Sequence, residues 1–283
     1  MATVELSAGT IEYDDSGGDG PVVVLLHGLA MDGSLWDAVV ADLRADARCI
    51  RPTLPFGSHR YPLHADADHT LRGLGRLVTE FLDALGLDDA ALVFDDWCAA
   101  PLMIEDGGMD RVGRLVILPC EAFENYPPGW PGRLAALSGW LPGGIAVMRR
   151  VLLNRTLRKL PFVYGVMSKR GVPDATMRAW LEPLKRREIR RDVRAYVRTT
   201  RGGRRDLLAA TESLANFERP VLIVWGSEDR MMPVAHAHRF ATAFPHARVI
   251  ELDDTYTLVP IDQPAPLTAL LREFVLEEAS AAS

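Results

Sequence analysis

The sequence predicts an α/β fold, a doubly wound and mostly parallel sheet with a helical cap inserted into it. The first indication is Val22–Leu26, an unbroken apolar run typical of a strand that is covered by helices on both faces. The second is the alternation of strand and helix patterns up to residue 120 and again from residue 221. The third is the stretch between them, where the patterns are helical. We therefore expect a core of residues 1–120 and 216–283 and a helical cap of residues 121–215.

The individual elements follow from local patterns in chain order. Two short strands joined by Ser7–Thr10 begin the chain, and the glycine-rich turn Ser16–Pro21 separates them from the first buried strand. The expected strands are Thr3–Leu6, Ile11–Tyr13, Val22–Leu26, Arg48–Arg51, Ala90–Phe94, Leu115–Leu118, Val221–Trp225 and Arg248–Leu252. The expected core helices are Ser34–Leu43, Thr70–Leu85, a short one after Trp97, Pro233–Phe244 and Leu267–Ala279.

Composition limits the classes of function. With 283 residues, 48% of them hydrophobic, the chain can bury the core of one large domain. Its net charge of −6 argues against general binding of nucleic acid or anionic membranes. Three cysteines without metal-type spacing favour reduced thiols and no metal site. Without a signal-peptide pattern or the roughly 18 consecutive apolar residues of a membrane span, we expect a cytoplasmic protein. Nothing in the sequence indicates an oligomeric state.

The most informative segment is the end of the strand Ala90–Phe94. The apolar run stops at Asp95-Asp96 and continues into a helix-compatible segment of small residues, which places Asp96 on a sharp strand-to-helix turn. Such a turn presents a side chain at the carboxyl edge of the sheet, and aspartate tolerates its left-handed backbone better than most residues. The competing interpretation is that Asp96 only caps the following helix. Of the two aspartates, Asp95 is the better candidate for a bystander.

Four segments in this order resemble the α/β-hydrolase fold, in its haloalkane dehalogenase and epoxide hydrolase branch. They are similar to the branch's His-Gly oxyanion loop, its His-Asp-Trp turn, its acid-bearing loop and the segment after its catalytic histidine. In this chain they are Leu25–Leu29, Asp95–Trp97, Val224–Asp229 and Val259–Pro264. Each match alone is weak, but the four together are specific.

The resemblance implies a role for each matching residue near the turn. Asp96 would be a carboxylate nucleophile that attacks a carbon bearing a halide or an epoxide oxygen and forms an ester. The backbone N–H groups of Leu29 and Trp97 would stabilise an oxyanion, and the Trp97 indole would hold a leaving halide. The alternative for Trp97 is a packing role under the cap. His27, beside Gly28, would organise the oxyanion loop and not act as a base.

The residue that should activate water is missing from the matched position. Asp229 stands where the family places the acid that orients the base, and Glu121 stands where a minority of the family places it. The family's Gly-His pair falls on Tyr256 and Thr257. Neither side chain accepts a proton near neutral pH, so we expect the usual catalytic histidine to be replaced.

Three explanations stay open at this stage. A displaced base could come from another loop at the same sheet edge, with His59 as the leading choice. Alternatively, Asp96 could act alone as an acid or base in a lyase, isomerase or cyclisation reaction, in a dry pocket that raises its pKa. The third explanation is a catalytically silent homologue that binds a ligand.

The cap contributes two further sets of residues. Basic side chains recur between Lys185 and Arg205 at intervals that spread around a helix, which indicates a solvated face or, alternatively, attraction of an anionic substrate. Tyr126, Tyr164 and Tyr196 are possible counterparts of the cap tyrosine that protonates an epoxide oxygen in similar enzymes. We therefore predict a hydrolase-like enzyme acting on a small or medium apolar epoxide, halide or ester-like molecule, without a metal or organic cofactor.

Overall fold

The computed structural model describes residues 1–276, so the last three residues of the expected helix Leu267–Ala279 lie outside the described part. The described residues form one eight-stranded sheet in the order β1-β2-β4-β3-β5-β6-β7-β8. Its strands are β1 (Ala2–Leu6), β2 (Gly9–Asp15), β3 (Val22–Leu25), β4 (Arg48–Thr53), β5 (Ala90–Asp96), β6 (Val112–Cys120), β7 (Val221–Gly226) and β8 (Ala247–Leu252). The first two strands pair antiparallel, β2 pairs antiparallel with β4, and the other pairings are parallel. The predicted fold class is confirmed.

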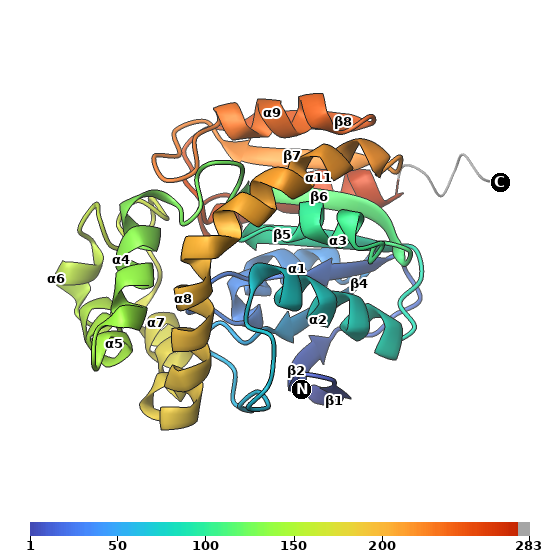
Figure 1. Cartoon of the computed structure of the whole chain (residues 1–283). Coiled ribbons are helices and arrows are strands. Elements are labelled where there is room, and N and C mark those ends of the chain that lie inside the picture. The colour runs from blue at the N-terminus through green and yellow to red at the C-terminus, as the bar shows by residue number, and fades with distance from the viewer. Residues whose placement is uncertain (277–283) are drawn as a thin grey trace.

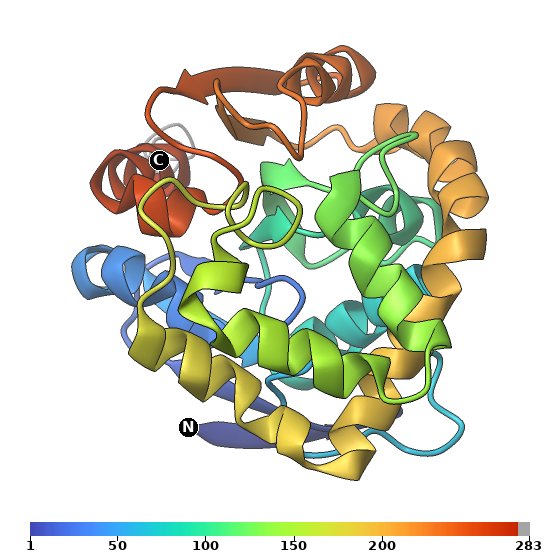
Figure 2. The ribbon, with the colours of Figure 1, turned by 90° about the vertical axis from the view of Figure 1, so that its left-hand side faces the viewer.

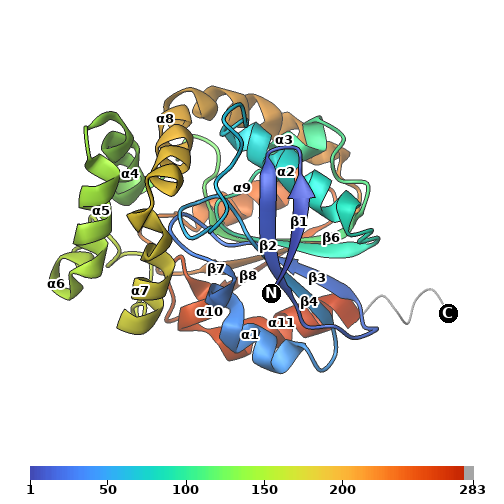
Figure 3. The same ribbon diagram turned by 90° about the horizontal axis from the view of Figure 1, so that it is seen from below.

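Helices cover both faces of this sheet (Figure 3). On one face lie η1 (Gly33–Trp36), α1 (Asp37–Leu43), α10 (Val259–Asp262) and α11 (Pro264–Leu276). On the other lie α2 (Leu71–Ala84), α3 (Ala100–Glu105) and α9 (Ala235–Ala243). The two-sided cover explains why β5 is buried along its whole length, as a parallel strand between two helical layers should be.

A group of helices fills the chain between β6 and β7. It comprises α4 (Gly129–Trp140), α5 (Gly144–Leu153), α6 (Arg155–Arg158), α7 (Asp174–Leu181), η2 (Pro183–Lys185), α8 (Arg187–Ala210) and η3 (Thr211–Asn216). We call residues 129–216 the insertion helices. Figures 1 and 2 show α4, α5, α6 and α7 gathered beyond one end of the sheet, while α8 runs from this group back along the core. There α8 contacts α2 and α3 as well as α4.

Two differences from the expected elements matter for the site. The strand expected to end at Phe94 continues to Asp96, because Asp96 pairs with Cys120 of β6 across an irregularity in the register. The short helix α10 begins two residues after Thr257, in a segment where no helix was expected. Among residues 1–276, no helix combines the length and the apolar character that crossing a bilayer requires.

The strand that carries Asp96 should be the most sensitive to loss of packing. Leu92 is fully buried in β5, in register with β3 and β6. We expect Leu92→Ala to lower the free energy of unfolding by about 2–5 kcal/mol, since it leaves a cavity in a packed core. Urea denaturation measures this. The control is Leu208→Ala at a side chain that is 38% exposed, and similar losses in the two variants would contradict the assignment of β5 to the core.

Candidate active site

Asp96 ends β5 in a left-handed conformation, with φ of 68°. The turn brings its carboxyl group over the loop that follows β3, because β3 and β5 are neighbours in the sheet. A side chain on Gly28 would overlap this carboxyl group, so only glycine permits the approach. The backbone N–H of Leu29 donates to Asp96 Oδ2 at 3.1 Å. The Leu29 N–H, one of the two expected oxyanion donors, therefore contacts an oxygen of Asp96.

His27 holds this loop in place. Its Nδ1 lies 2.9 Å from the Gly28 carbonyl oxygen, and its Nε2 accepts a hydrogen bond of 2.8 Å from the Leu54 N–H. Burial lowers the pKa of His27 to about 4, so the ring is neutral at physiological pH. Both ring nitrogens are occupied by backbone groups, which leaves none for a substrate.

Trp97 lies differently from what the resemblance implies. Its backbone N–H donates to the Asp95 carbonyl oxygen at 2.8 Å and so is not free to face an oxyanion. Its indole is 1% exposed and packs edge-on against Phe56 and Phe94. Among the described residues, Trp97 does not line the cavity that contains Asp96. The packing interpretation of Trp97 agrees best with these contacts.

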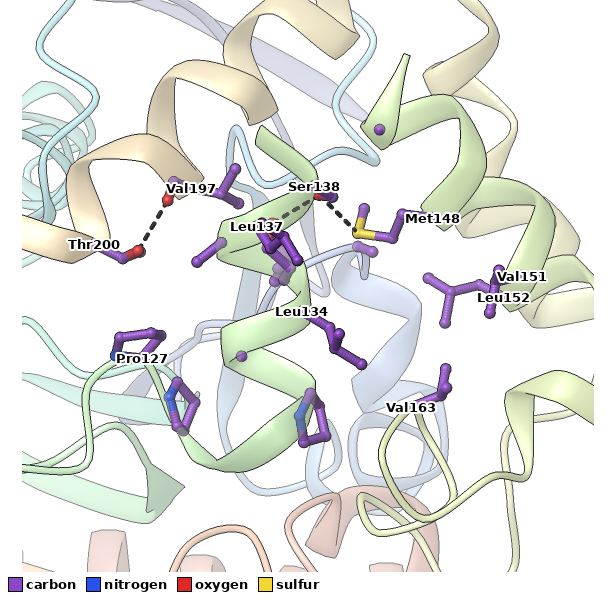
Figure 4. Close-up of a pocket in the computed structure, with 18 of the residues that line it drawn as sticks. Pro127, Leu134, Leu137, Ser138, Met148, Val151, Leu152, Val163, Val197 and Thr200 are labelled. Atoms are coloured by element: carbon purple, nitrogen blue, oxygen red, sulfur yellow. Dashed lines mark hydrogen bonds between the residues drawn. The ribbon is translucent and has the colours of Figure 1, made fainter. Parts of the chain in front are cut away.

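Asp96 and Glu121 line the same cavity, whose volume is about 370 Å³. Figure 4 shows its apolar walls, with Leu134 and Leu137 from α4, Val151 and Leu152 from α5, and Val197 from α8. None of the described residues that line it is a lysine, an arginine or a histidine. The described lining is therefore apolar, with two carboxyl groups and no cationic side chain.

Asp96 and Glu121 interact electrostatically with two further carboxyl groups, the buried Asp95 and the half-buried Asp229. Burial raises the pKa of Asp96 to about 7. Burial, and next the charge of Asp96, raises the pKa of Glu121 well above its usual range. Burial also raises the pKa of Asp95 far above normal, with smaller effects from Asp96 and Asp229. In the described chain neither oxygen of Asp95 has a hydrogen-bond partner, so this residue is no solvent-facing bystander.

The fourth carboxyl group contacts the residue at the matched histidine position. Thr257 Oγ1 donates to Asp229 Oδ2 at 2.9 Å, while the N–H groups of Met231 and Met232 donate to Oδ1 at 2.8 Å each. Burial raises the pKa of Asp229 to about 7. The ring of Tyr256 lies under the side chains of Lys169 and Arg230. Neither Tyr256 nor Thr257 is among the described cavity-lining residues.

His59 is not brought to Asp96. Its Nδ1 accepts a 3.2 Å hydrogen bond from the Gly57 N–H, and its Nε2 lies 3.3 Å from Asp192 Oδ2 on α8. His69 lies on the other oxygen of Asp192, at 3.6 Å. Burial lowers the pKa of His59. This buried network between a core loop and α8 was not predicted, because the path of a loop is not readable from local patterns.

Two of the three tyrosines proposed for the cap line the cavity, namely Tyr164 and Tyr196. Burial raises the pKa of both phenols, and the charge of Asp96 contributes to each shift. Within residues 1–276 the Tyr164 hydroxyl lacks a hydrogen-bond partner, as does that of Tyr126, which lies outside the lining. No group of three or more metal-ligating side chains occurs in the described part.

Comparison with known proteins agrees with this architecture. The chain belongs to the Alpha/beta hydrolase family, whose model matches residues 23–270. Haloalkane dehalogenase 2 of Mycobacterium tuberculosis is 26% identical over 286 residues, covering 94% of this chain and 92% of the relative. Cis-3-alkyl-4-alkyloxetan-2-one decarboxylase of Xanthomonas campestris is 28% identical over 290 residues, covering 93% and 90%. A haloalkane dehalogenase loop variant from Bradyrhizobium elkanii has the same fold, with a TM-score of 0.78, 20% identity, and coverage of 100% of this chain and 98% of that chain.

The contact between Gly28 and Asp96 can be tested by adding one methyl group. Gly28→Ala forces the Asp96 carboxyl group or the loop to move. We expect a loss of about 1–3 kcal/mol in the free energy of unfolding, the usual range for overpacking. Gly202→Ala is the matched control, because an added Cβ there meets no described atom within 4 Å. Equal unfolding free energies for the two variants would mean that Asp96 does not approach Gly28 as described.

The raised pKa of Asp96 predicts how stability depends on pH. An acid with a folded pKa of about 7 holds its proton more tightly in the native state than in the unfolded chain. Its contribution is therefore most favourable at low pH and is lost as the pH rises through 7. Compared with the native protein, Asp96→Asn should gain on the order of 1–3 kcal/mol between pH 5 and pH 8.

Urea denaturation of both proteins at the two pH values measures this difference, in which the titration of groups that do not interact with Asp96 cancels. Asp66→Asn, at an exposed aspartate, should show no such change. A constant difference between native protein and Asp96→Asn would show that Asp96 ionises normally.

Proposed function

We propose that the protein is a hydrolase that opens the epoxide ring of an apolar small molecule, with Asp96 as the nucleophile and Glu121 as its acid and base. The observation that supports this proposal is the pair of carboxyl groups in one apolar cavity that lacks a histidine among its described lining residues. The proposal divides the chain into a core of residues 1–120 and 216–283 and a cap of residues 121–215. It needs no metal or organic cofactor.

In the first step the proton and the charge lie on different carboxyl groups. The Leu29 N–H donates to Asp96 and favours its ionised form, whereas burial and the charge of Asp96 both raise the pKa of Glu121. In this mechanism Glu121 therefore carries the proton while Asp96 is ionised. A carboxylate oxygen of Asp96 attacks an epoxide carbon, the carbon–oxygen bond of the ring breaks, and the oxygen takes the proton of Glu121. The products are an ester on Asp96 and an ionised Glu121.

In the second step Glu121 changes its role. Formation of the ester removes the charge of Asp96, which is one cause of the raised pKa of Glu121. Glu121 then accepts a proton from water as the water attacks the ester carbonyl carbon, and the Leu29 N–H stabilises the oxyanion. Collapse breaks the ester bond to the substrate oxygen, which takes the proton of the regenerated Asp96 carboxyl group and leaves as a diol. Asp96 ends ionised and Glu121 protonated, as at the start.

An epoxide suits the cavity better than a haloalkane. Halide release would place an anion beside two carboxyl groups, and the described lining offers no cation to offset it. An opening ring needs a proton donor, and Glu121, Tyr164 and Tyr196 all line the cavity. The Xanthomonas relative is named for an alkyl-substituted oxetanone, which is also a strained oxygen ring.

The proposal gives the remaining predicted residues supporting roles. Thr257 takes the place of the usual histidine and binds Asp229, so Asp229 positions this loop and orients no base. His27 and Gly28 position the Leu29 N–H. His59 receives no catalytic role, since its ring faces Asp192.

One alternative has specific support. With a pKa of about 7, Asp96 could serve as a proton acceptor and donor without forming an ester, which suits a lyase, isomerase or cyclase. This alternative differs in its product, because an isomer keeps the mass of the substrate.

Isotope labelling tests the covalent route. With enzyme in excess over styrene oxide in H₂¹⁸O, we expect one heavy oxygen in the Asp96 peptide and none in the first diol released. Glu121→Gln should lower turnover at least 100-fold, because glutamine can neither give a proton to the ring oxygen nor accept one from water. Glu124→Gln is the control, because Glu124 binds Arg239 at the surface. Mass spectrometry of the digested protein reads each result.

The other outcomes identify what is wrong. Heavy oxygen in the first diol and none in Asp96 would mean that water, activated by a general base, attacks the epoxide directly. Asp96 would then not be the nucleophile. A product with the mass of the substrate would favour the acid–base alternative. If the native protein gives neither an adduct on Asp96 nor turnover, and if Asp96→Asn binds the ligand unchanged, the protein is a catalytically silent binding protein.

A further inference from the structure

A row of arginines on α8 lines a groove on the outside of the insertion helices. The groove has a volume of about 460 Å³, and α8 contributes Arg187, Arg190, Arg191, Arg194 and Arg198 to it. Most of these positions follow the helical spacing of three and four residues, so they lie on one face of α8 and do not spread around it. The opposite wall is the start of α5 and the turn before it.

Most of these arginines have no acidic partner among the described residues. Of the five, only Arg191 forms an ion pair, with Asp192, in the described part of the chain. The Nε atoms of Arg194 and Arg198 donate to the Gly139 carbonyl oxygen at 2.8 and 2.9 Å, which fixes their guanidinium groups against the end of α4. Several positive charges are thus held close together in a protein with a net charge of −6. Such an arrangement favours binding of an anion.

The groove adjoins the cavity that contains Asp96. Leu141 and Gly144 line both. Near them the apolar side chains of Leu137 and Val147 are 51% and 54% exposed, although both also line the cavity. An apolar path therefore leads from the cavity to the rim where the arginines begin. A negative group inside the cavity would meet two carboxyl groups, whereas one at the rim would meet guanidinium groups.

We propose that the substrate is an amphiphile whose anionic head group, a carboxylate or a phosphate, binds in the arginine groove while its apolar chain occupies the cavity. This inference rests on the proposed function for the reactive end, which would lie at Asp96. Arginine suits both head groups, because the planar guanidinium donates two parallel hydrogen bonds to carboxylate or phosphate oxygens.

Calorimetry with unreactive probes tests the inference. We expect dodecanoate to bind the native protein at least tenfold more tightly than 1-dodecanol, and we expect this advantage to shrink between 50 and 500 mM salt. Arg187→Glu should remove most of the advantage and leave dodecanol binding unchanged. Arg187 is suited to this test because it lines the groove and makes no hydrogen bond or ion pair within residues 1–276. Arg150→Glu, an exposed arginine on α5 outside the groove, is the control of equal charge change.

Two results would overturn the inference. Equal affinity for dodecanoate and dodecanol would mean that the groove does not contact the head group. Binding of inorganic phosphate as tight as that of dodecyl phosphate would mean that the groove holds free anions and not amphiphiles. The probes contain no epoxide, so these binding results do not depend on whether Asp96 forms an ester. The two proposals can therefore fail separately.

Discussion

The site depends on the close approach of the Asp96 carboxyl group to the loop after β3. Because β3 and β5 are neighbours in the sheet, the two chain segments lie side by side. The left-handed turn at Asp96 directs the carboxyl group toward the loop, and Gly28 has no side chain that would block it. The Leu29 N–H then fixes one oxygen and leaves the other for chemistry. His27 holds the loop in place, because its Nε2 accepts a hydrogen bond from the Leu54 N–H. Without this approach, the carboxyl group would have neither a defined direction nor an oxyanion donor.

The buried carboxyl groups oppose folding, which is the best reason to regard them as functional. Removing a charge from water costs several kcal/mol unless it is paired, so such groups keep their protons and their pKa rises. Asp95 illustrates the cost, since it is fully buried and has no hydrogen-bond partner in the described chain. A core selected for stability alone would replace it with an apolar residue. Because their pKa values are raised, the four carboxyl groups carry fewer than four negative charges. A proton can then be held by one group or another, which a residue acting first as an acid and then as a base requires.

Local patterns predicted the fold and the turn but not the contacts of side chains on loops. The apolar run of β5 and the small residues after it located Asp96, because strand and helix periods are local properties. The order of the matched segments located Asp229 and Thr257, although the hydrogen bond between them was not expected. By contrast, the N–H direction of Trp97 depends on a single backbone angle, and the contact of His59 with Asp192 joins residues 133 apart in the sequence. The basic residues of α8 were expected to spread around the helix, whereas five of its arginines line one groove, because residues three and four apart share a helical face.

The insertion helices separate two kinds of charge that would cancel each other if they were adjacent. One face of α8 sends Tyr196, Val197 and Thr200 into the cavity, while another holds Arg194 and Arg198 in the groove. A single helix therefore fixes the spacing between the proposed anion site and the proposed nucleophile, with apolar surface between them. A ligand that contacts both must have a chain of matching length, because a shorter one leaves either the arginines or Asp96 unengaged. Under this arrangement, substrate length is selected by the geometry of α8 and its neighbours, and reactivity by the carboxyl groups beneath it.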